Sequence, residues 1–129
     1  LLQIHNKLGA NATVLSADIK EPKGYGRIIR GKNKNLLKII EEKDATRDEK
    51  TVKEINSGIY MFESQTLFNL LPMVNNNNSQ KEYYLPDVLN LILGQNDLVA
   101  IEKINNEIEI QGINDTIQLK KMNEYYSKN

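Results

Sequence analysis

The chain has 129 residues, no cysteine, and 17 basic against 17 acidic residues. That length suits one domain with its own core. A formal net charge of zero argues against a general nucleic-acid binder, because such binding needs a basic face. The absence of cysteine excludes disulfides, thiolate metal sites and a cysteine nucleophile.

The start of the sequence is unusual. It has no initiator Met, and its first residues already show the apolar spacing of an amphipathic helix that ends at Gly9. This suggests a piece of a longer protein. No signal peptide is recognisable and the apolar runs are too short to cross a bilayer, so we expect a cytoplasmic protein with no membrane partner.

Strand-like and helix-like segments then alternate along the chain, which predicts the α/β class. Their boundaries are read from apolar periodicity, turn residues and helix caps. The expected elements are a buried strand at 12–19, strands at 27–31 and 35–42 around a polar turn, a charged loop with a short helix at 43–54, a strand at 54–64, a helix at 65–74 capped by Ser64, a surface loop at 75–78, a helix at 85–96 with Pro86 in its first turn, strands at 97–104 and 106–110, and a polar helix at 114–129.

Polar clusters lie where these segments end or begin. Ligands of α/β proteins bind beyond the carboxyl ends of strands, so such positions are candidate binding loops. The clusters are GYGR at 24–27, IEEKD at 40–44, EINSG at 54–58, EYYLPD at 82–87 and QGIND at 111–115.

Taken singly, each cluster favours a structural explanation. The glycines fit a turn, the Glu41 region fits a solvated charge group, Asn56 fits an amide bonded within the fold, and Asn114 fits a helix cap. The alternative in each case is a ligand contact. His5, the single histidine, lies away from all the clusters, and Arg27 has no role that its neighbours in the sequence indicate.

The order of the clusters along the chain is more specific than any one of them. ATVLSA, PKGYGRIIR, IIEEKDA, EINSGIY, EYYLPDV and GIND together resemble the uridylyltransferase domain of bacterial N-acetylglucosamine-1-phosphate uridylyltransferase. That family is commonly bifunctional, with glucosamine-1-phosphate acetyltransferase on the same polypeptide. The resemblance runs from about His5 to Asn114. It implies a partial Rossmann-like, glycosyltransferase-A-like α/β fold with a mixed sheet flanked by helices.

The same resemblance implies a reaction, ligands and site residues. The family forms UDP-N-acetylglucosamine, a cell-wall precursor, and pyrophosphate from UTP and N-acetylglucosamine 1-phosphate, using Mg²⁺ and no protein nucleophile. Gly26 matches a backbone contact to the sugar, and Glu41 matches the carboxylate that binds sugar hydroxyls. Asn56 matches an amide near the sugar, and Tyr84 an aromatic residue beside the sugar–phosphate site. Asn114 matches the asparagine that contacts the product and ligates magnesium.

The sequence also departs from the family pattern. It lacks the glycine-rich UTP loop, the Gly-Asp segment that ligates magnesium, and the hexapeptide repeats of the acetyltransferase β-helix, through which family members form homotrimers. Pro86 stands where threonine is usual, Thr116 where arginine is usual, and Gln111 where glutamate is usual.

These departures lead us to expect that residues 1–129 are the sugar-binding C-terminal part of a uridylyltransferase domain, inactive alone. Two alternatives stay open. One is a nucleotidyltransferase for another hexose 1-phosphate, and the other is a non-catalytic module that binds sugar nucleotides.

Overall fold

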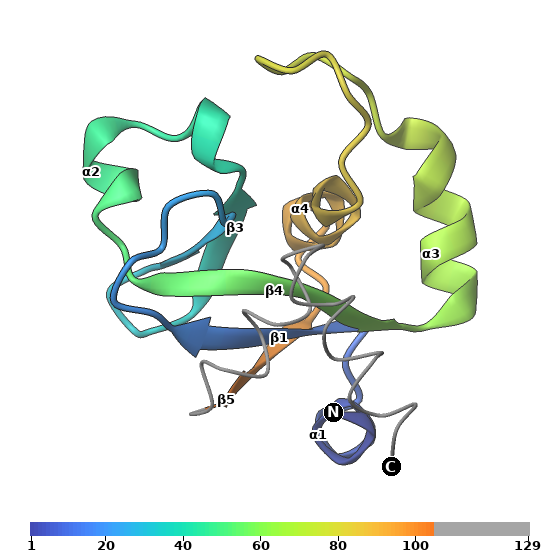
Figure 1. Cartoon of the computed structure of the whole chain (residues 1–129). Helices are drawn as coiled ribbons and strands as arrows, with labels where there is room; N and C mark the ends of the chain where they lie inside the picture. Colours follow the sequence, from blue (N-terminus) through green and yellow to red (C-terminus); the bar gives the residue numbers. More distant parts are fainter. Residues whose placement is uncertain (105–129) are drawn as a thin grey trace, which may run out of the picture.

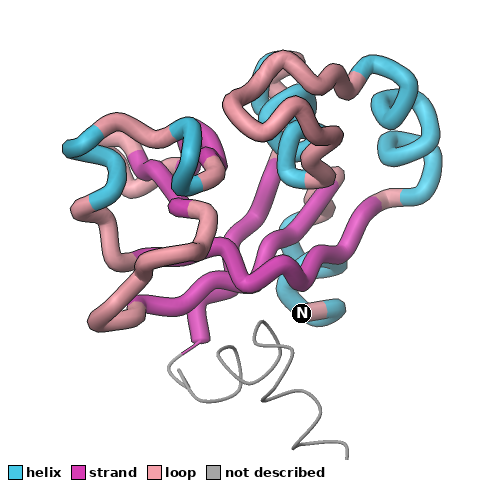
Figure 2. The backbone as a smooth tube through the Cα atoms, turned by 45° about the horizontal axis from the view of Figure 1, so that its top comes forward, coloured by secondary structure: helices cyan, strands magenta, loops and turns pink. Residues whose placement is uncertain are grey.

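The structure is a computed structural model that describes residues 1–104. These residues form a five-stranded sheet with helices on both faces (Figures 1 and 2). The elements in chain order are α1 (Leu2–Leu8), β1 (Ala12–Asp18), β2 (Arg27–Arg30), β3 (Leu36–Ile40), the 3₁₀ helix η1 (Glu42–Asp44), α2 (Arg47–Lys50), β4 (Glu54–Phe62), α3 (Ser64–Leu70), the 3₁₀ helix η2 (Leu71–Met73), α4 (Pro86–Gly94) and β5 (Val99–Ile104). No helix within these residues is long and apolar enough to cross a membrane.

The sheet is mixed. Its strand order is β3-β2-β4-β1-β5, in which β1 and β5 are parallel and the other neighbours are antiparallel. The expected α/β architecture with a mixed sheet flanked by helices is therefore confirmed. β2 meets β4 through one residue pair, Arg27 with Ile55, so the β2–β3 hairpin joins the rest of the sheet at the end where the β1–β2 loop returns.

The main core lies between the sheet and helices α3 and α4, while α1 lies on the opposite face (Figure 1). Apolar side chains of β1, β2, β3 and β5 meet those of the two helices. The fully or nearly buried members are Ala12, Val14, Ile28, Leu36, Ile39, Leu70, Val88, Leu89, Ile92 and Val99.

In addition to its packing in the core, helix α4 is hydrogen-bonded to the edge strand β3 through the side chain of Asn90. The amide of Asn90 accepts a hydrogen bond from the backbone N–H of Ile39 at 2.9 Å and donates one to the carbonyl of the same residue at 2.9 Å. It thereby occupies the hydrogen-bonding groups that an edge strand otherwise leaves free. This contact sets the start of α4 beside the end of β3, where Glu41 follows.

Strand β4 contains a bulge. Val14 of β1 pairs with Tyr60 and Ser16 pairs with Asn56, so one intervening residue on β1 faces three on β4. Gly58, in the middle of the bulge, has a φ of 84°, a left-handed conformation that favours glycine. The bulge shortens the path between Asn56 and Tyr60.

Most of the expected elements within the described residues are confirmed, with two corrections at α3. Ser64 is not the cap of α3 but its first residue, and Glu63 is the N-cap, without a capping side-chain bond. The helix also ends earlier than expected, at Leu70. Pro72 has no N–H to continue the α-helical pattern, and the chain turns into η2. The strand expected at 106–110 and the helix expected at 114–129 lie outside the described residues.

Candidate functional site

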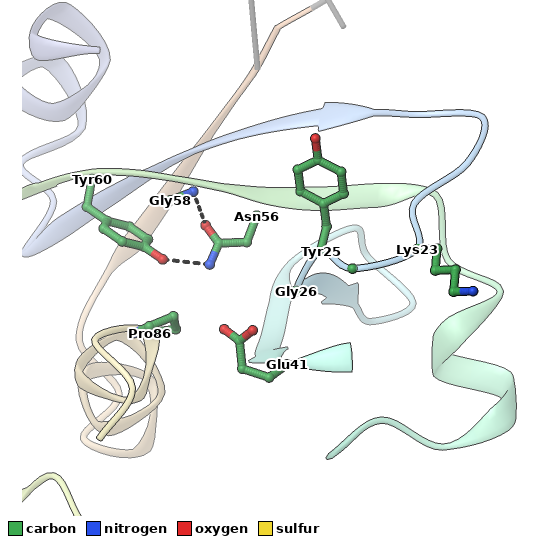
Figure 3. Close-up of a pocket in the computed structure, with 9 residues that line it drawn as sticks. Lys23, Tyr25, Gly26, Glu41, Asn56, Gly58, Tyr60 and Pro86 are labelled. Carbon is green, nitrogen blue, oxygen red and sulfur yellow. Dashed lines mark hydrogen bonds between the residues drawn. The ribbon is translucent and has the colours of Figure 1, made fainter. Parts of the chain in front are cut away.

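Gly26, Glu41 and Asn56, which the resemblance assigned to one site, line a single cavity of about 490 Å³ (Figure 3). They come from three segments: the loop before β2, the residue after β3, and strand β4. Tyr60 and Pro86 complete the wall on the α4 side. The fold therefore brings together residues that are up to 60 positions apart in the sequence, from Gly26 to Pro86.

Gly26 keeps this cavity open. It is buried, and its carbonyl accepts a hydrogen bond from the Asn56 N–H at 2.9 Å. A Cβ at this position would lie 3.4 Å from Glu41 Oε1 and 3.6 Å from Asn56 Cβ. Those are ordinary contacts, so the backbone itself does not forbid a side chain. Any side chain would, however, fill the space between the carboxylate and the amide.

Glu41 follows the last residue of β3 and is half-buried. Its pKa is raised above the ordinary value for glutamate, first by burial and then by the charges of Asp44, Asp87 and Glu82. This carboxylate is partly shielded from solvent, and no cation contributes to the shift of its pKa. It is therefore well placed to accept hydrogen bonds from the hydroxyls of a ligand.

Asn56 is 7% exposed and lies inside strand β4, within the strand that the sequence predicted at 54–64. Its Oδ1 accepts the Gly58 N–H at 2.9 Å, and its Nδ2 donates to the Tyr60 hydroxyl at 2.6 Å (Figure 3). In a regular strand, residues four apart are separated by about 13 Å. The bulge at Gly58 is what lets the two side chains touch.

Tyr60 was not among the residues expected from the sequence. Burial raises its pKa to about 12, opposed by the hydrogen bond from Asn56 and assisted by the charge of Glu41. Its hydroxyl therefore stays protonated at ordinary pH. One signal was present: a glycine within a strand pattern indicates a bulge, and a bulge changes where the flanking side chains point.

Arg27, to which sequence reasoning gave no role, organises the loop that carries Gly26. Its side chain is 3% exposed, and its guanidinium donates to the carbonyls of Tyr25, Lys50 and Val52. It also pairs with Glu42 at 3.0 Å, and the same carboxylate oxygen accepts the Gly24 N–H at 2.8 Å.

Because Glu42 adjoins Glu41, the pair formed by Arg27 and Glu42 ties the glycine loop to the end of β3. The partners of Arg27 are as many as twenty-five positions away in the sequence. No local pattern could have indicated them.

Tyr84 lies in a second cavity of about 400 Å³, which shares Glu41 and Pro86 with the first. Its hydroxyl accepts a hydrogen bond from Gln80 Nε2 at 2.8 Å. Tyr84 therefore adjoins the group formed by Gly26, Glu41 and Asn56 without lining the same cavity. Asn114, the remaining expected site residue, lies outside the described residues.

The loop between α3 and α4 closes one side of this second cavity. Asp44, at the end of η1, accepts the Ser79 N–H at 2.8 Å. That hydrogen bond lowers the pKa of Asp44, burial opposes the shift, and hydrogen bonds with the Ser79 and Tyr84 side chains add to it. One carboxylate thus holds the loop against the sheet.

Within residues 1–104, no group of three or more His, Cys, Asp or Glu side chains is arranged to hold a metal ion. The expected Mg²⁺ ligand, Asn114, lies beyond them. The residues that the structure describes therefore do not form a metal site by themselves.

The pattern of a known family covers most of the chain. Residues 1–107 match the family described as nucleotidyl transferase. The chain belongs to this family. The mixed sheet agrees with it, because a solved structure from Bacillus anthracis, named as a glucose-1-phosphate thymidylyltransferase in complex with sucrose, superimposes with a TM-score of 0.61. That similarity covers 81% of this chain and 39% of the other at 18% identity, so it bears on the fold alone.

Closer relatives confirm the resemblance seen in the sequence. The chain is 45% identical to the bifunctional protein GlmU of Staphylococcus saprophyticus over its whole length, which is 30% of that protein. It is 47% identical over 92% of its length to the GlmU of Bacillus cytotoxicus, and 44% identical over 95% to that of Carboxydothermus hydrogenoformans. The nucleotidyltransferase chain thus spans about 30% of the length of such relatives.

Proposed function

We propose that this chain binds the sugar 1-phosphate in a nucleotidyltransferase that makes UDP-N-acetylglucosamine and pyrophosphate from UTP and N-acetylglucosamine 1-phosphate. The observation that supports it best is the convergence of Gly26, Glu41 and Asn56 on one cavity. They are the residues that the resemblance assigns to the sugar. The match of residues 1–107 to the nucleotidyl transferase family is consistent with it.

Each residue has a physical role in this proposal. Glu41 accepts hydrogen bonds from neighbouring sugar hydroxyls, which its two oxygens can do together. Gly26 leaves the sugar ring room against the backbone, and Asn56 offers an amide held rigid by Gly58 and Tyr60. Tyr84, in the adjoining cavity, would border the sugar phosphate.

The reaction asks for positioning more than for covalent chemistry. A phosphate oxygen of the sugar 1-phosphate attacks the α-phosphorus of UTP, a new P–O bond forms, and the bond to the bridging oxygen breaks as pyrophosphate leaves. Holding the sugar so that its phosphate points at UTP is then the contribution of this part of the enzyme. The expected Mg²⁺ would bind through Asn114, which lies outside the described residues.

A binding titration tests the proposal. UDP-N-acetylglucosamine is titrated into the full chain, into Glu41→Ala and into Asn56→Ala, with the exposed Glu21→Ala as a control. Each site variant should weaken binding by about 1–3 kcal/mol, because each leaves ligand groups without a buried partner. Glu21→Ala should bind like the wild type.

Two results would overturn the proposal in different ways. Unchanged affinity in both site variants would mean that the ligand does not occupy this cavity. Tighter binding of UDP-glucose than of UDP-N-acetylglucosamine would instead assign the cavity to another hexose.

A further inference from the structure

We infer that Tyr60 binds the sugar directly, by donating a hydrogen bond from its hydroxyl to an oxygen of the ligand in the cavity lined by Gly26, Glu41 and Asn56. This inference rests on the proposed function and adds a specificity-determining residue to it. Tyr60 lies on the same wall as Asn56, and its hydroxyl points toward the Asn56 amide (Figure 3).

The orientation of the Asn56 amide decides where the Tyr60 proton points. The Gly58 backbone N–H lies 2.9 Å from one end of that amide. Because an N–H is a donor, the atom facing it must be the amide oxygen. The other end is then the NH₂ group, and it lies 2.6 Å from the Tyr60 hydroxyl oxygen.

The hydroxyl of Tyr60 is therefore an acceptor in this contact, and its own proton is directed elsewhere. Within residues 1–104, that hydroxyl makes no hydrogen bond other than the one it accepts from Asn56. It faces a cavity wide enough for a ligand. Tyr60 is half-buried, and no protein acceptor within the described residues takes its hydroxyl proton, so an oxygen of a ligand in the cavity can accept it.

The surroundings of Tyr60 keep its hydroxyl protonated. Burial is the main cause that raises the pKa of Tyr60 to about 12, and the charge of Glu41 adds to it. The cavity thus presents the carboxylate of Glu41 as an acceptor and the hydroxyl of Tyr60 as a donor. A polyol such as a sugar carries both complementary groups on one ring, whereas an apolar ligand satisfies neither.

The inference is tested with the full chain and with Tyr60→Phe, which removes the hydroxyl but keeps the ring that packs against Phe62 and the core. Tyr83→Phe, at a residue that is 72% exposed, is the matched control. The ligands are N-acetylglucosamine 1-phosphate and a panel of analogues that each lack one sugar oxygen. Affinities are measured by ligand-observed NMR titration, and folding by circular dichroism.

We expect Tyr60→Phe to weaken binding of the parent ligand about five- to tenfold, as the loss of one ligand hydrogen bond should, and Tyr83→Phe to leave it unchanged. One analogue should bind the wild type more weakly than the parent ligand does, by a similar factor. The same analogue and the parent ligand should bind Tyr60→Phe with equal affinity. That loss of discrimination identifies the oxygen that Tyr60 contacts. Asn56→Ala, measured with the same analogues, should keep the discrimination at that oxygen, because Tyr60 contacts it directly.

Other results would overturn the inference. If Tyr60→Phe weakens the parent and every analogue by the same factor, Tyr60 contacts none of the oxygens, and if it changes no affinity, it has no role in binding. If Asn56→Ala loses the same discrimination as Tyr60→Phe, Tyr60 acts through Asn56 alone. If the wild type itself does not bind the parent ligand, the proposed function fails, and the inference with it. The wild-type titration separates that failure from the other results.

Discussion

The two cavities that meet at Glu41 are held open in different ways. The first is built on backbone hydrogen bonds: the Asn56 N–H donates to the Gly26 carbonyl, and the Gly58 N–H orients the Asn56 side chain. The second depends on side chains within a loop. Asp44 holds the Ser79 N–H, and the Asn78 Oδ1 accepts the Glu82 N–H at 3.1 Å.

This difference separates a preformed region from one that can rearrange. The residues that we assign to the sugar ring lie in the sheet-based cavity, where a ligand meets positions that are already set. Tyr84, which we place beside the phosphate, lies in the loop-based cavity. Loops held by few contacts open at lower free energy than strands do. The variants below test whether the two cavities respond separately.

The largest effect should come from Arg27→Lys. Lysine keeps the positive charge but loses the planar fork that reaches the carbonyls of Tyr25 and Val52. Buried charge-assisted hydrogen bonds are then lost, and we expect the free energy of unfolding to fall by about 2–3 kcal/mol. Urea unfolding measures this loss, and UDP-N-acetylglucosamine titration should show weaker binding, because the glycine loop is released.

Arg30→Lys is the matched control for this prediction. Arg30 lies on the same strand and makes two bonds to Glu54, at 2.6 and 2.8 Å, but neither residue lines the cavity. It should cost a comparable free energy of unfolding and leave ligand affinity unchanged. Equal effects of the two variants on affinity would show that Arg27 matters to the site only through overall stability.

Gly58→Ala should have the next largest effect. A φ of 84° is unfavourable for an L-residue with a Cβ, and left-handed backbone of this kind costs about 1–2 kcal/mol. Relief of the strain would flatten the bulge and separate Asn56 from Tyr60, so binding should weaken as well. Gly94→Ala, where a Cβ would meet nothing within 4 Å, is the control and should be neutral or stabilising in α4. Chemical denaturation of both variants measures the difference.

How much of the fold and of the two cavities the sequence could predict depends on how far apart in the sequence the interacting residues lie. The helices and strands within residues 1–104 follow from local periodicity and turn chemistry. The grouping of Gly26, Glu41 and Asn56 at one cavity was expected from the resemblance to the family segments. The Arg27 network could not be predicted, because two of its acceptors, the carbonyls of Lys50 and Val52, come from the segment just before β4 and no local pattern links them to Arg27. The misplaced cap at Ser64 has a local cause, since either of two adjacent polar residues could begin α3.

The division of the site into two cavities was likewise beyond the sequence. Family motifs place Tyr84 near the sugar, but the path of the 75–85 loop depends on Asp44, which holds Ser79 across 35 positions. Tyr60 depends on the bulge, and a glycine in a strand pattern indicates a bulge without giving its geometry. Residues set by long-range hydrogen bonds are therefore the ones that the structure adds.

Asp44→Ala should loosen the second cavity and leave the first intact. Asp44 is only half-buried, so we expect a loss of only about 0.5–1 kcal/mol in the free energy of unfolding. The pKa of this carboxyl is lowered in the folded state, so its contribution is present above the ordinary aspartate pKa and is lost as the pH falls through the lowered value. Hydrogen exchange should become faster at residues 75–84 and not in β4.

For Asp44→Ala, the exposed Asp48→Ala serves as the control and should leave the exchange of that loop unchanged. Faster exchange in β4 as well as in the loop would contradict the separation of the two cavities.

Glu41→Gln should produce the smallest change in stability, with the opposite sign. Burial, Asp44 and Asp87 raise the pKa of Glu41, so the folded chain binds this proton more tightly than the unfolded chain does. Stability therefore falls as the pH rises from the ordinary glutamate pKa through the raised one, and the full cost is present at neutral pH. Glutamine carries no such charge. Thermal melts should show the variant more stable than the wild type at neutral pH, with no advantage below the ordinary glutamate pKa, while ligand affinity falls because one carboxylate acceptor is lost. If the wild type is instead more stable than Glu41→Gln at neutral pH, the Glu41 carboxylate has a favourable partner in the folded chain. It would then not be available to a ligand.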